Sequence, residues 1–286
     1  MNGTVTTASG AVIAYDVVGR PDDPALVLVQ GYSAQLLGWP AAFCGLLADA
    51  GFRVIRFDNR DVGRSQRYPG GGYGIADLAE DTVALLDGLG IDEAHVVGQS
   101  MGGMVAQVLA LDHPARVRSL GLIYTTPSLR YAIGADLVSA SVQTGPAVRD
   151  REQFAAAYVV AERHCASTAY PQDIAWLAEL GRQMYDRSPD VSGHARQLQA
   201  VLTMPDLDDR LGGVSVPTTI LAGDADRLID HAASAALHDL IPGSASTVFP
   251  GMGHELPQPL WSEIVSLLTD NARTAGEERT RARTAG

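Results

Sequence analysis

The chain has few cysteines, fewer basic than acidic residues and no cluster of possible metal ligands. Its 286 residues include only Cys44 and Cys165, which form no CxxC pair and show no Cys/His ligand spacing. Neither a disulfide framework nor a zinc site is expected. The seven histidines are scattered, so no metal and no cofactor are predicted. With 21 basic against 33 acidic residues, the net charge of −12 argues against a nucleic-acid partner, because affinity for phosphate backbones comes largely from Lys and Arg.

Long apolar runs are absent as well. No window approaches the roughly 20 apolar residues that a membrane span needs. The first ten residues, MNGTVTTASG, have neither the basic start nor the apolar stretch of a signal peptide. We therefore expect a cytoplasmic protein that does not act at a membrane; the sequence leaves its oligomeric state open. Hydrophobic residues make up 46% of the chain, enough to fill the core of one large α/β domain.

Short apolar or β-branched runs alternate with helical stretches along most of the chain. This order predicts an α/β fold with a mostly parallel, eight-stranded sheet and helices on both faces. The predicted strands are 4–7, 11–18, 25–30, 54–57, 95–98, 117–124, 218–222 and 245–249. The predicted helices of the core are 40–50, 77–89, 101–112, 231–240 and 260–271.

The alternation divides the chain into four parts. Residues 1–125 form the first part of the core, and 214–272 complete it. Between them, residues 126–213 lack strand-like runs and read as several helices broken by prolines, which predicts an inserted helical cap. The last part, 273–286, is small and polar with four Arg and two Glu, which favours a disordered, solvated tail.

The sequence Gly98-Gln99-Ser100-Met101-Gly102 fits the G-x-S-x-G pattern of a nucleophile turn. In such a turn, serine lies on a strained connection between a strand and a helix, with its hydroxyl exposed. Glycines are needed two residues before and after it because larger side chains would collide with the neighbouring strand and helix. A buried strand before the motif and a helix after it strengthen the match. We predict Ser100 as a nucleophile.

Serine needs a base within hydrogen-bond reach and a carboxylate that orients the base. After Ser100, the chain offers Asp226 beyond one predicted strand and His254 beyond the next, in the order nucleophile, acid, base. Both follow the carboxyl ends of strands, where open α/β sheets bind ligands. Asp224 is the alternative acid; we prefer Asp226 because it stands further along the loop. The remaining alternative for His254 is an ordinary surface histidine.

Acyl transfer also needs hydrogen-bond donors for the developing oxyanion. We expect one from the backbone N–H of Met101, at the start of the helix after Ser100, where the helix dipole assists. The second is expected from the loop after strand 25–30, and we assign it to the N–H of Tyr32. The alternative is that Gly31 in this loop only makes a turn.

Together, several motifs resemble the α/β-hydrolase superfamily over nearly the full length of the chain. They are Gln-Gly-Tyr at 30–32, Leu-Gly-Trp-Pro at 37–40, the segment 56–65, Gly-Gln-Ser-Met-Gly-Gly at 98–103 and Pro-Gly-Met-Gly-His at 250–254. Within this superfamily, the chain most resembles aclacinomycin methylesterase, a tailoring enzyme of anthracycline biosynthesis, and related bacterial serine esterases. The resemblance implies carboxylic-ester hydrolysis by Ser100, Asp226 and His254, under a cap that covers an apolar pocket.

Two departures from the superfamily pattern concern loops. Gln30 stands where many members have histidine, which leaves a backbone donor possible in this loop. Asp61 replaces the first glycine of the Asp-x-Arg-Gly-x-Gly-x-Ser segment. For this segment we expect a structural role, with Asp58 and Arg60 satisfying the loop backbone and one another. The glycine-rich stretch 70–74 lacks the Lys-Ser/Thr of a P-loop and is expected to be a flexible loop.

Aromatic side chains are candidates for the substrate pocket. These candidates are Trp39, Tyr131, Tyr158, Trp176 and Tyr185. The alternative is that aromatic residues of a helical cap pack its own core.

We therefore expect a serine hydrolase that cleaves an apolar small-molecule ester, with a methyl ester of an aromatic polyketide implied by the resemblance. Two alternatives use the same scaffold. One is a cofactor-free perhydrolase of the haloperoxidase type, and the other is a non-catalytic binding protein, because fold does not dictate function. Dehalogenases and epoxide hydrolases are excluded because they need a carboxylate where this chain has Ser100.

Overall fold

The core of the protein is one twisted sheet of eight strands. The computed structural model of the chain describes residues 2–8, 10–134 and 150–284. The strands are β1 Asn2–Thr6, β2 Val12–Val18, β3 Ala25–Val29, β4 Arg53–Phe57, β5 Ala94–Gln99, β6 Val117–Ile123, β7 Thr218–Gly223 and β8 Ala245–Phe249. Their order is β1-β2-β4-β3-β5-β6-β7-β8. The pairs β1–β2 and β2–β4 are antiparallel and the other five pairs are parallel, so the predicted mostly parallel, eight-stranded sheet is confirmed.

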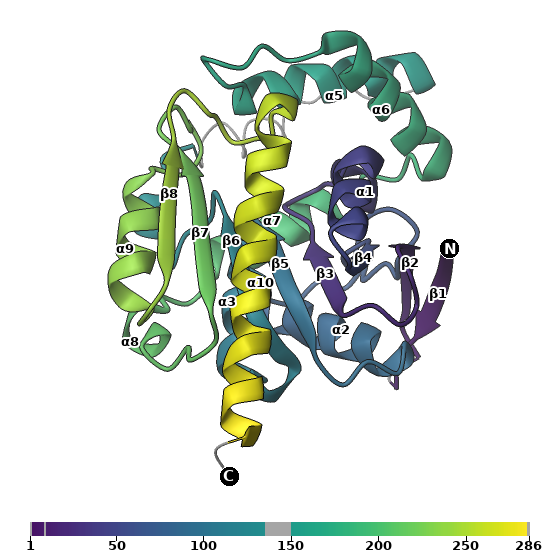
Figure 1. Ribbon diagram of the computed structural model, residues 1–286. Coiled ribbons are helices and arrows are strands. Elements are labelled where there is room, and N and C mark those ends of the chain that lie inside the picture. Colours follow the sequence, from purple (N-terminus) through teal and green to yellow (C-terminus); the bar gives the residue numbers. More distant parts are fainter. Residues whose placement is uncertain (1, 9, 135–149, 285–286) are drawn as a thin grey trace.

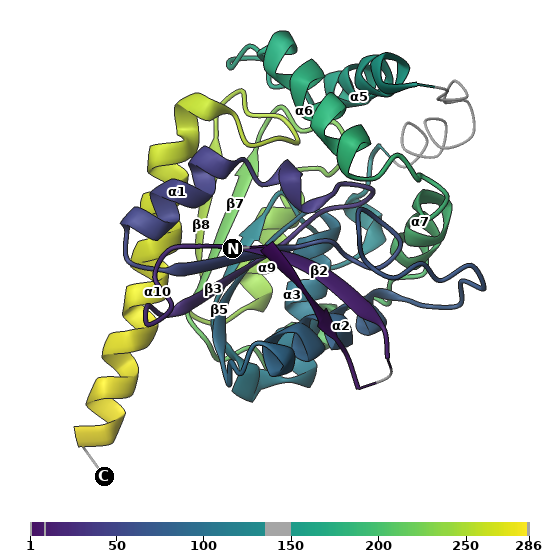
Figure 2. The ribbon, with the colours of Figure 1, turned by 90° about the vertical axis from the view of Figure 1, so that its right-hand side faces the viewer.

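Helices cover both faces of the sheet, with α1 and α10 on one face and α2, α3 and α9 on the other (Figures 1 and 2). These helices are α1 Ala41–Asp49, α2 Ile75–Gly88, α3 Met101–Asp112, α9 Ala232–Leu240 and α10 Trp261–Thr284. Short 3-10 turns lie at Leu36–Gly38, Pro114–Arg116, Leu129–Tyr131 and Gln258–Leu260. No helix in the described ranges combines the length and apolar character required to cross a membrane.

Every residue of β3 is buried, as a strand covered on both faces requires. Leu26 and Leu28 join the apolar cluster under α1 and α10, whereas Val27 and Val29 join the cluster under α2 and α3. This alternation follows from the two-residue period of a strand. The sheet is thereby held rigidly between two cores, and the residues at its carboxyl ends start from fixed positions.

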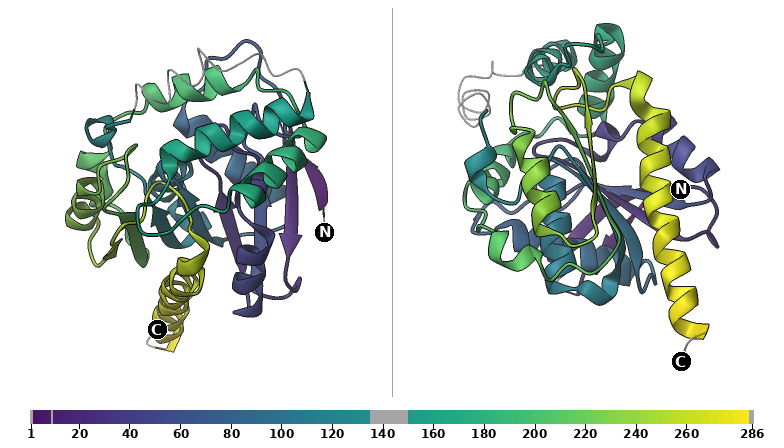
Figure 3. Two further views of the ribbon diagram at one scale, coloured as in Figure 1. Left: turned by 90° about the horizontal axis from the view of Figure 1, so that it is seen from above. Right: turned by 60° about the vertical axis from the view of Figure 1, so that its left-hand side comes forward.

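The segment between β6 and β7 crosses those carboxyl ends. It contains α5 Arg151–Cys165, α6 Ile174–Arg187, α7 His194–Leu202 and α8 Asp208–Leu211. Seen from above, α5 and α6 lie across the end of the sheet (Figure 3). Apart from one isolated bridge between Ala132 and Ile229, the regular structure in its described residues is helical. This arrangement agrees with a helical cap over 126–213, although residues 135–149 lie outside the described ranges.

The loop after β4 joins the cap to the core. The carboxylate of Asp58 is fully buried and accepts hydrogen bonds from the backbone N–H groups of Leu36 and Arg64, both at 2.8 Å. It also pairs with Arg187 of α6 at 2.6 Å. Arg60 instead pairs with Asp81 of α2 at 2.6 Å. The expected mutual pairing of Asp58 and Arg60 is therefore wrong, because each charge finds its partner on a different helix.

Asp61, the residue that departs from the superfamily pattern, anchors α7. Its backbone has φ 71°, in the region that favours glycine. The carboxylate accepts two hydrogen bonds from Arg196 of α7, at 2.9 and 2.7 Å, and one from the hydroxyl of Tyr73 at 2.8 Å. The aspartate thus adopts the backbone conformation of the glycine it replaces and adds an ionic contact to the cap.

The C-terminal segment differs from its prediction. Residues 273–284 continue α10 as helix instead of forming a disordered tail. Ala275 is 3% exposed, so the helix still packs at this point. The segment is rich in Ala, Glu and Arg, which are strong helix formers, and it extends a helix that is already nucleated. Composition alone does not distinguish such an extension from a solvated tail.

Candidate functional site

Ser100 lies on a sharp turn between β5 and α3. Its backbone angles are φ 54° and ψ −122°, a conformation that side-chain-bearing residues rarely adopt. A Cβ at Gly98 would lie 2.1 Å from the carbonyl oxygen of Gly102, and a Cβ at Gly102 would lie 2.1 Å from that of Val29. The two glycines are therefore required by close approach of the helix and of the neighbouring strand, as the motif predicts.

The structure brings Ser100, His254 and Asp226 together from three strand ends. Ser100 Oγ lies 2.8 Å from His254 Nε2, and His254 Nδ1 lies 2.7 Å from Asp226 Oδ2. The other carboxylate oxygen of Asp226 accepts the N–H groups of Leu228 and Ile229, at 2.8 and 3.0 Å. These bonds orient the carboxylate toward the imidazole. A carboxylate on Nδ1 holds the N–H there and leaves Nε2 free to accept a proton from the serine.

Asp224, the alternative acid, points elsewhere. Its Oδ1 accepts the backbone N–H of Gly251 at 2.6 Å, on the loop that leads to His254. Asp226 is 8% exposed and lies beside the histidine. The geometry therefore agrees with the choice of Asp226, and Asp224 has a separate role in bracing the histidine loop.

The expected oxyanion donors flank Ser100. Met101 is the first residue of α3, so its N–H has no acceptor within the helix. Tyr32 follows Gly31, and a Cβ at Gly31 would lie 3.3 Å from the Cβ of Ser100. The loop after β3 thus approaches the nucleophile so closely that glycine is favoured at this position. Both Tyr32 and Met101 line the cavity that contains the serine hydroxyl.

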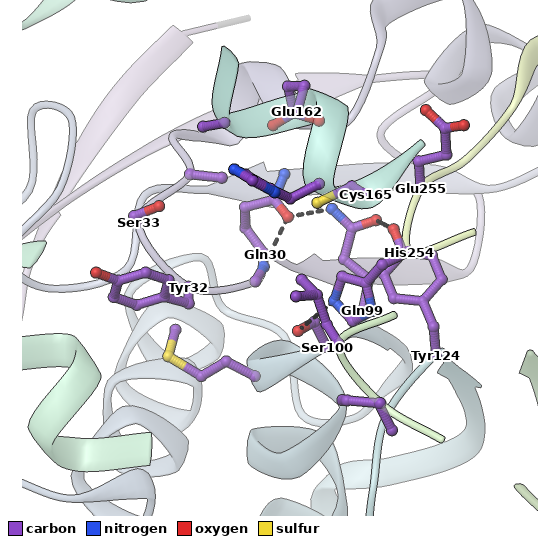
Figure 4. Close-up of a pocket in the computed structure, with 18 of the residues that line it drawn as sticks. Gln30, Tyr32, Ser33, Gln99, Ser100, Tyr124, Glu162, Cys165, His254 and Glu255 are labelled. Atoms are coloured by element: carbon purple, nitrogen blue, oxygen red, sulfur yellow. Dashed lines mark hydrogen bonds between the residues drawn. The ribbon is translucent and has the colours of Figure 1, made fainter. Parts of the chain in front are cut away.

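Three side chains, from Tyr124, Gln99 and Gln30, form a series of hydrogen bonds that supports this loop (Figure 4). The hydroxyl of Tyr124 donates to Gln99 Oε1, and Gln99 Nε2 donates to Gln30 Oε1. Gln30 Oε1 also accepts the N–H of Gly31 at 2.6 Å. The ring of Tyr124 lies 4.6 Å from that of His254. Gln30 therefore braces the oxyanion loop through a side chain at the position where many superfamily members have histidine.

A cavity of about 330 Å³ opens above Ser100, between the sheet and the cap. This volume lies within the range of small-molecule sites. Most of its lining is apolar, including Met104, Leu180, Val201, Leu228 and Ile229. Among the described residues, no group of three His, Cys, Asp or Glu side chains is positioned to hold a metal ion.

Two of the five predicted pocket residues, Tyr158 and Trp176, line this cavity. Trp39, Tyr131 and Tyr185 are not part of its described lining. Trp39 is fully buried and stacks on Phe43 in the apolar cluster between the sheet and the helices α1 and α10. Tyr131 packs against the core under the guanidinium of Arg130. Tyr185 packs against Phe154 inside the cap. The alternative, packing within the cap, therefore holds for Tyr185, whereas Trp39 and Tyr131 pack with the apolar clusters on the sheet.

Several titratable groups of the cap face the cavity. Burial raises the pKa values of Tyr158 and Cys165, and it raises the pKa of Glu162 to about 7. His164 and Glu255 also belong to the lining. Glu162 was not among the residues predicted from the sequence, although its spacing of four residues from Tyr158 places both on one face of α5.

Comparison with known proteins places these features in a family context. A family model described as alpha/beta hydrolase fold matches residues 24–142. A putative carbamate hydrolase of Variovorax paradoxus is 33% identical over 249 residues, which cover 84% of this chain and 88% of that protein. A rhodomycin D methylesterase of a Streptomyces species is 45% identical over 105 residues, which cover 36% of this chain and 35% of the methylesterase.

Solved structures show the same architecture. A hydrolase from Pseudomonas aeruginosa is 29% identical and superposes with a TM-score of 0.74 over 93% of this chain and 98% of that one. An enol-lactonase from Burkholderia xenovorans is 23% identical and superposes with a TM-score of 0.78 over 94% of this chain and 99% of that one. At that identity, the second likeness concerns the fold alone.

Proposed function

This chain belongs to the α/β-hydrolase family, as its motifs indicated, and on that premise we propose that it is a serine hydrolase of carboxylic esters. The observation that carries the proposal is the continuous contact from Ser100 Oγ through His254 to Asp226, at 2.8 and 2.7 Å. Geometry of this kind activates a hydroxyl that is a poor nucleophile at neutral pH.

In the proposed reaction, His254 Nε2 accepts the proton of Ser100 while the serine oxygen attacks the ester carbonyl. The backbone N–H groups of Tyr32 and Met101 stabilise the negative charge that develops on the carbonyl oxygen. His254 then passes its proton to the departing alkoxide, so that an alcohol leaves and an acyl-enzyme remains. A water molecule, deprotonated by His254, attacks the acyl group, and the carboxylic acid is released as Ser100 regains its proton.

The surroundings of His254 support this role. Asp226 accepts from His254 Nδ1 and stabilises the imidazolium that forms in each half-reaction. The side chains of His254 and Asp226 are 8% and 1% exposed, so water is largely excluded from their hydrogen bond. The apposed ring of Tyr124 limits tilting of the imidazole. Losing one oxyanion donor typically raises the activation barrier by about 2.7–4 kcal/mol. The hydrogen bond from Gly31 to Gln30, which holds the oxyanion loop in place, is therefore expected to affect kcat.

For the substrate, we propose an apolar, aromatic or polycyclic ester, such as the methyl ester of an aromatic polyketide. The largely apolar lining of the cavity, with Tyr158 and Trp176, favours such an occupant. The methylesterase relatives support the same class over about a third of the chain. Carbamates are the competing class, because the relatives that align over most of the chain are named putative carbamate hydrolases.

The test is labelling with a fluorophosphonate probe, followed by peptide mapping. Wild-type protein is expected to carry the probe on Ser100, and Ser100→Ala and His254→Ala are expected to lose the label. Ser33→Gly is the matched control, since Ser33 also lines the cavity and has a positive φ that glycine accepts. Folded wild-type protein without label at Ser100 would exclude a serine hydrolase.

A substrate panel then separates the reaction classes. Aryl esters, methyl esters of polycyclic aromatic acids and aryl carbamates with the same leaving group are compared by kcat/KM. The proposal expects esters to exceed carbamates and Ser100→Ala to lower ester turnover at least 10³-fold, as the loss of a nucleophile in a triad does. Peroxide-dependent oxidation that exceeds ester hydrolysis would instead indicate a perhydrolase.

A further inference from the structure

The polar part of the cavity is acidic on the side of the cap. Glu162 of α5 and Glu255, which follows His254, both belong to its lining, and Figure 4 shows them on the cap side of the site. No arginine lines the cavity in the described part of the chain, and the chain contains no lysine. Within the described lining, a substrate therefore meets these carboxylates and the imidazoles of His164 and His254, but no guanidinium or ammonium group.

The two carboxylates differ in their partners. Glu255 Oε1 accepts the N–H of Ser167, and Oε2 accepts the side-chain amide of Gln172, both at 2.7 Å. Glu255 is therefore committed to holding the segment after α5. Glu162 has no ion-pair partner among the described residues; its carboxyl contacts the hydroxyl of Tyr158, four residues earlier on the same helix.

The raised pKa of Glu162 agrees with a carboxyl group that has no cationic partner. Burial is the main cause that raises the pKa of Glu162 to about 7, and the charge of Glu255 adds to it. The Tyr158 hydroxyl and the nearby His254 oppose the increase in pKa but do not cancel it. Burying a carboxylate without a paired cation is unfavourable, and a cationic ligand would relieve that cost.

We propose that the cavity binds esters that carry a cationic amine, with the ammonium group seated against Glu162. The inference rests on the proposed function and adds to it the charge of the substrate. Glu162 is then a specificity-determining residue: it attracts a cation through a medium of low effective dielectric and repels an anionic ester. The apolar walls accommodate the rest of the molecule.

The test uses two isosteric 4-nitrophenyl esters that differ in one atom. One is the ester of 4-(trimethylammonio)butanoic acid, and the other is the ester of 5,5-dimethylhexanoic acid, in which carbon replaces the charged nitrogen. Values of kcat/KM are measured at pH 8 and divided by the rate of hydroxide hydrolysis of each ester. The 4-nitrophenyl monoester of glutaric acid supplies an anionic probe.

The expected preference of wild-type protein for the cationic ester is at least tenfold. Glu162→Gln is expected to reduce this preference at least fivefold and to raise the relative rate of the anionic ester. Glu152→Gln is the matched control, because it removes one charge from the same helix at a side chain that is 65% exposed and paired with Arg182. This variant is expected to keep the preference within about twofold, as an exposed charge is screened by solvent.

Two results would overturn the inference. One is equal or faster hydrolysis of the neutral ester by wild-type protein, and the other is an undiminished cation preference in Glu162→Gln. Labelling of Ser100 by fluorophosphonate, measured on the same samples, separates the two levels of the proposal. If Ser100 is labelled and the neutral ester is cleaved without any charge preference, only the cation site is wrong; if neither occurs, the proposed hydrolase function itself fails.

Discussion

Arg187→Ala removes the guanidinium of α6 that pairs with the buried carboxylate of Asp58 at 2.6 Å. Breaking a buried ion pair by removing one partner typically costs about 3–5 kcal/mol, because the remaining charge stays buried. Two features reduce the cost here. The side chain of Arg187 is 13% exposed, and Asp58 keeps the N–H groups of Leu36 and Arg64. We therefore expect Arg187→Ala to lower the free energy of unfolding by about 2–3 kcal/mol.

The assay is urea unfolding followed by far-ultraviolet circular dichroism, with thermal unfolding as a second measure. For a protein of this size, a loss of 2–3 kcal/mol corresponds to a decrease in Tm of roughly 3–5 °C. Arg182→Ala is the matched control, because Arg182 lies on the same helix and pairs with the exposed Glu152 at 2.9 Å. Its expected cost is about 0–1 kcal/mol.

A double-mutant cycle with Asp58→Asn isolates the pair itself. The coupling energy between Asp58 and Arg187 is expected to exceed about 1 kcal/mol, because both side chains are largely buried and water cannot replace the lost partner of either charge. If Arg187→Ala costs no more than Arg182→Ala, or if the coupling energy is near zero, the reasoning that this pair fastens the cap to the core is refuted.

Three further predictions concern the turn, its brace and acid stability. Gly102→Ala should destabilise the fold and lower kcat/KM, because the added Cβ would lie 2.1 Å from the carbonyl oxygen of Val29. The control is Gly45→Ala in α1, where a Cβ would meet no atom outside its own helix within 4 Å, and this variant should raise Tm slightly. Gln99→Leu should lower kcat about 10-fold or more with a smaller change in KM, because it releases the oxyanion loop; an unchanged kcat would contradict this role. Burial lowers the pKa of His194 to about 4, so the unfolded chain binds more protons between pH 6.5 and 4, and stability falls as pH falls. Between pH 7 and pH 5, His194→Gln should therefore reduce the loss in the free energy of unfolding, measured by urea unfolding, by at most about 2 kcal/mol. The same dependence on pH in wild type and variant would contradict the role of His194.

The parts of this protein that are local in sequence were predictable from it. The strand before Ser100, the glycines around it and the helix after it stand within a few residues of one another, so one short pattern specifies the turn. The fully apolar run of β3 likewise predicts a strand buried on both faces. The order of Asp226 and His254 after successive strands followed from the same alternation, because parallel strands bring their carboxyl ends to one edge.

Only the tertiary structure decided which side chains meet across long separations. Asp226 reaches His254 whereas Asp224 turns to the loop of Gly251, although both aspartates follow the same strand. Hydrophobicity predicts that an aromatic residue is buried, but it does not say where: Trp39 packs between the sheet and α1, and Tyr158 faces the cavity. The cap is attached to the core by ion pairs between residues far apart in the sequence, Arg187 with Asp58 and Arg196 with Asp61. This attachment places Glu162 in the cavity above Ser100. Sequence periodicity specifies the faces of single elements, and only packing determines what each face meets.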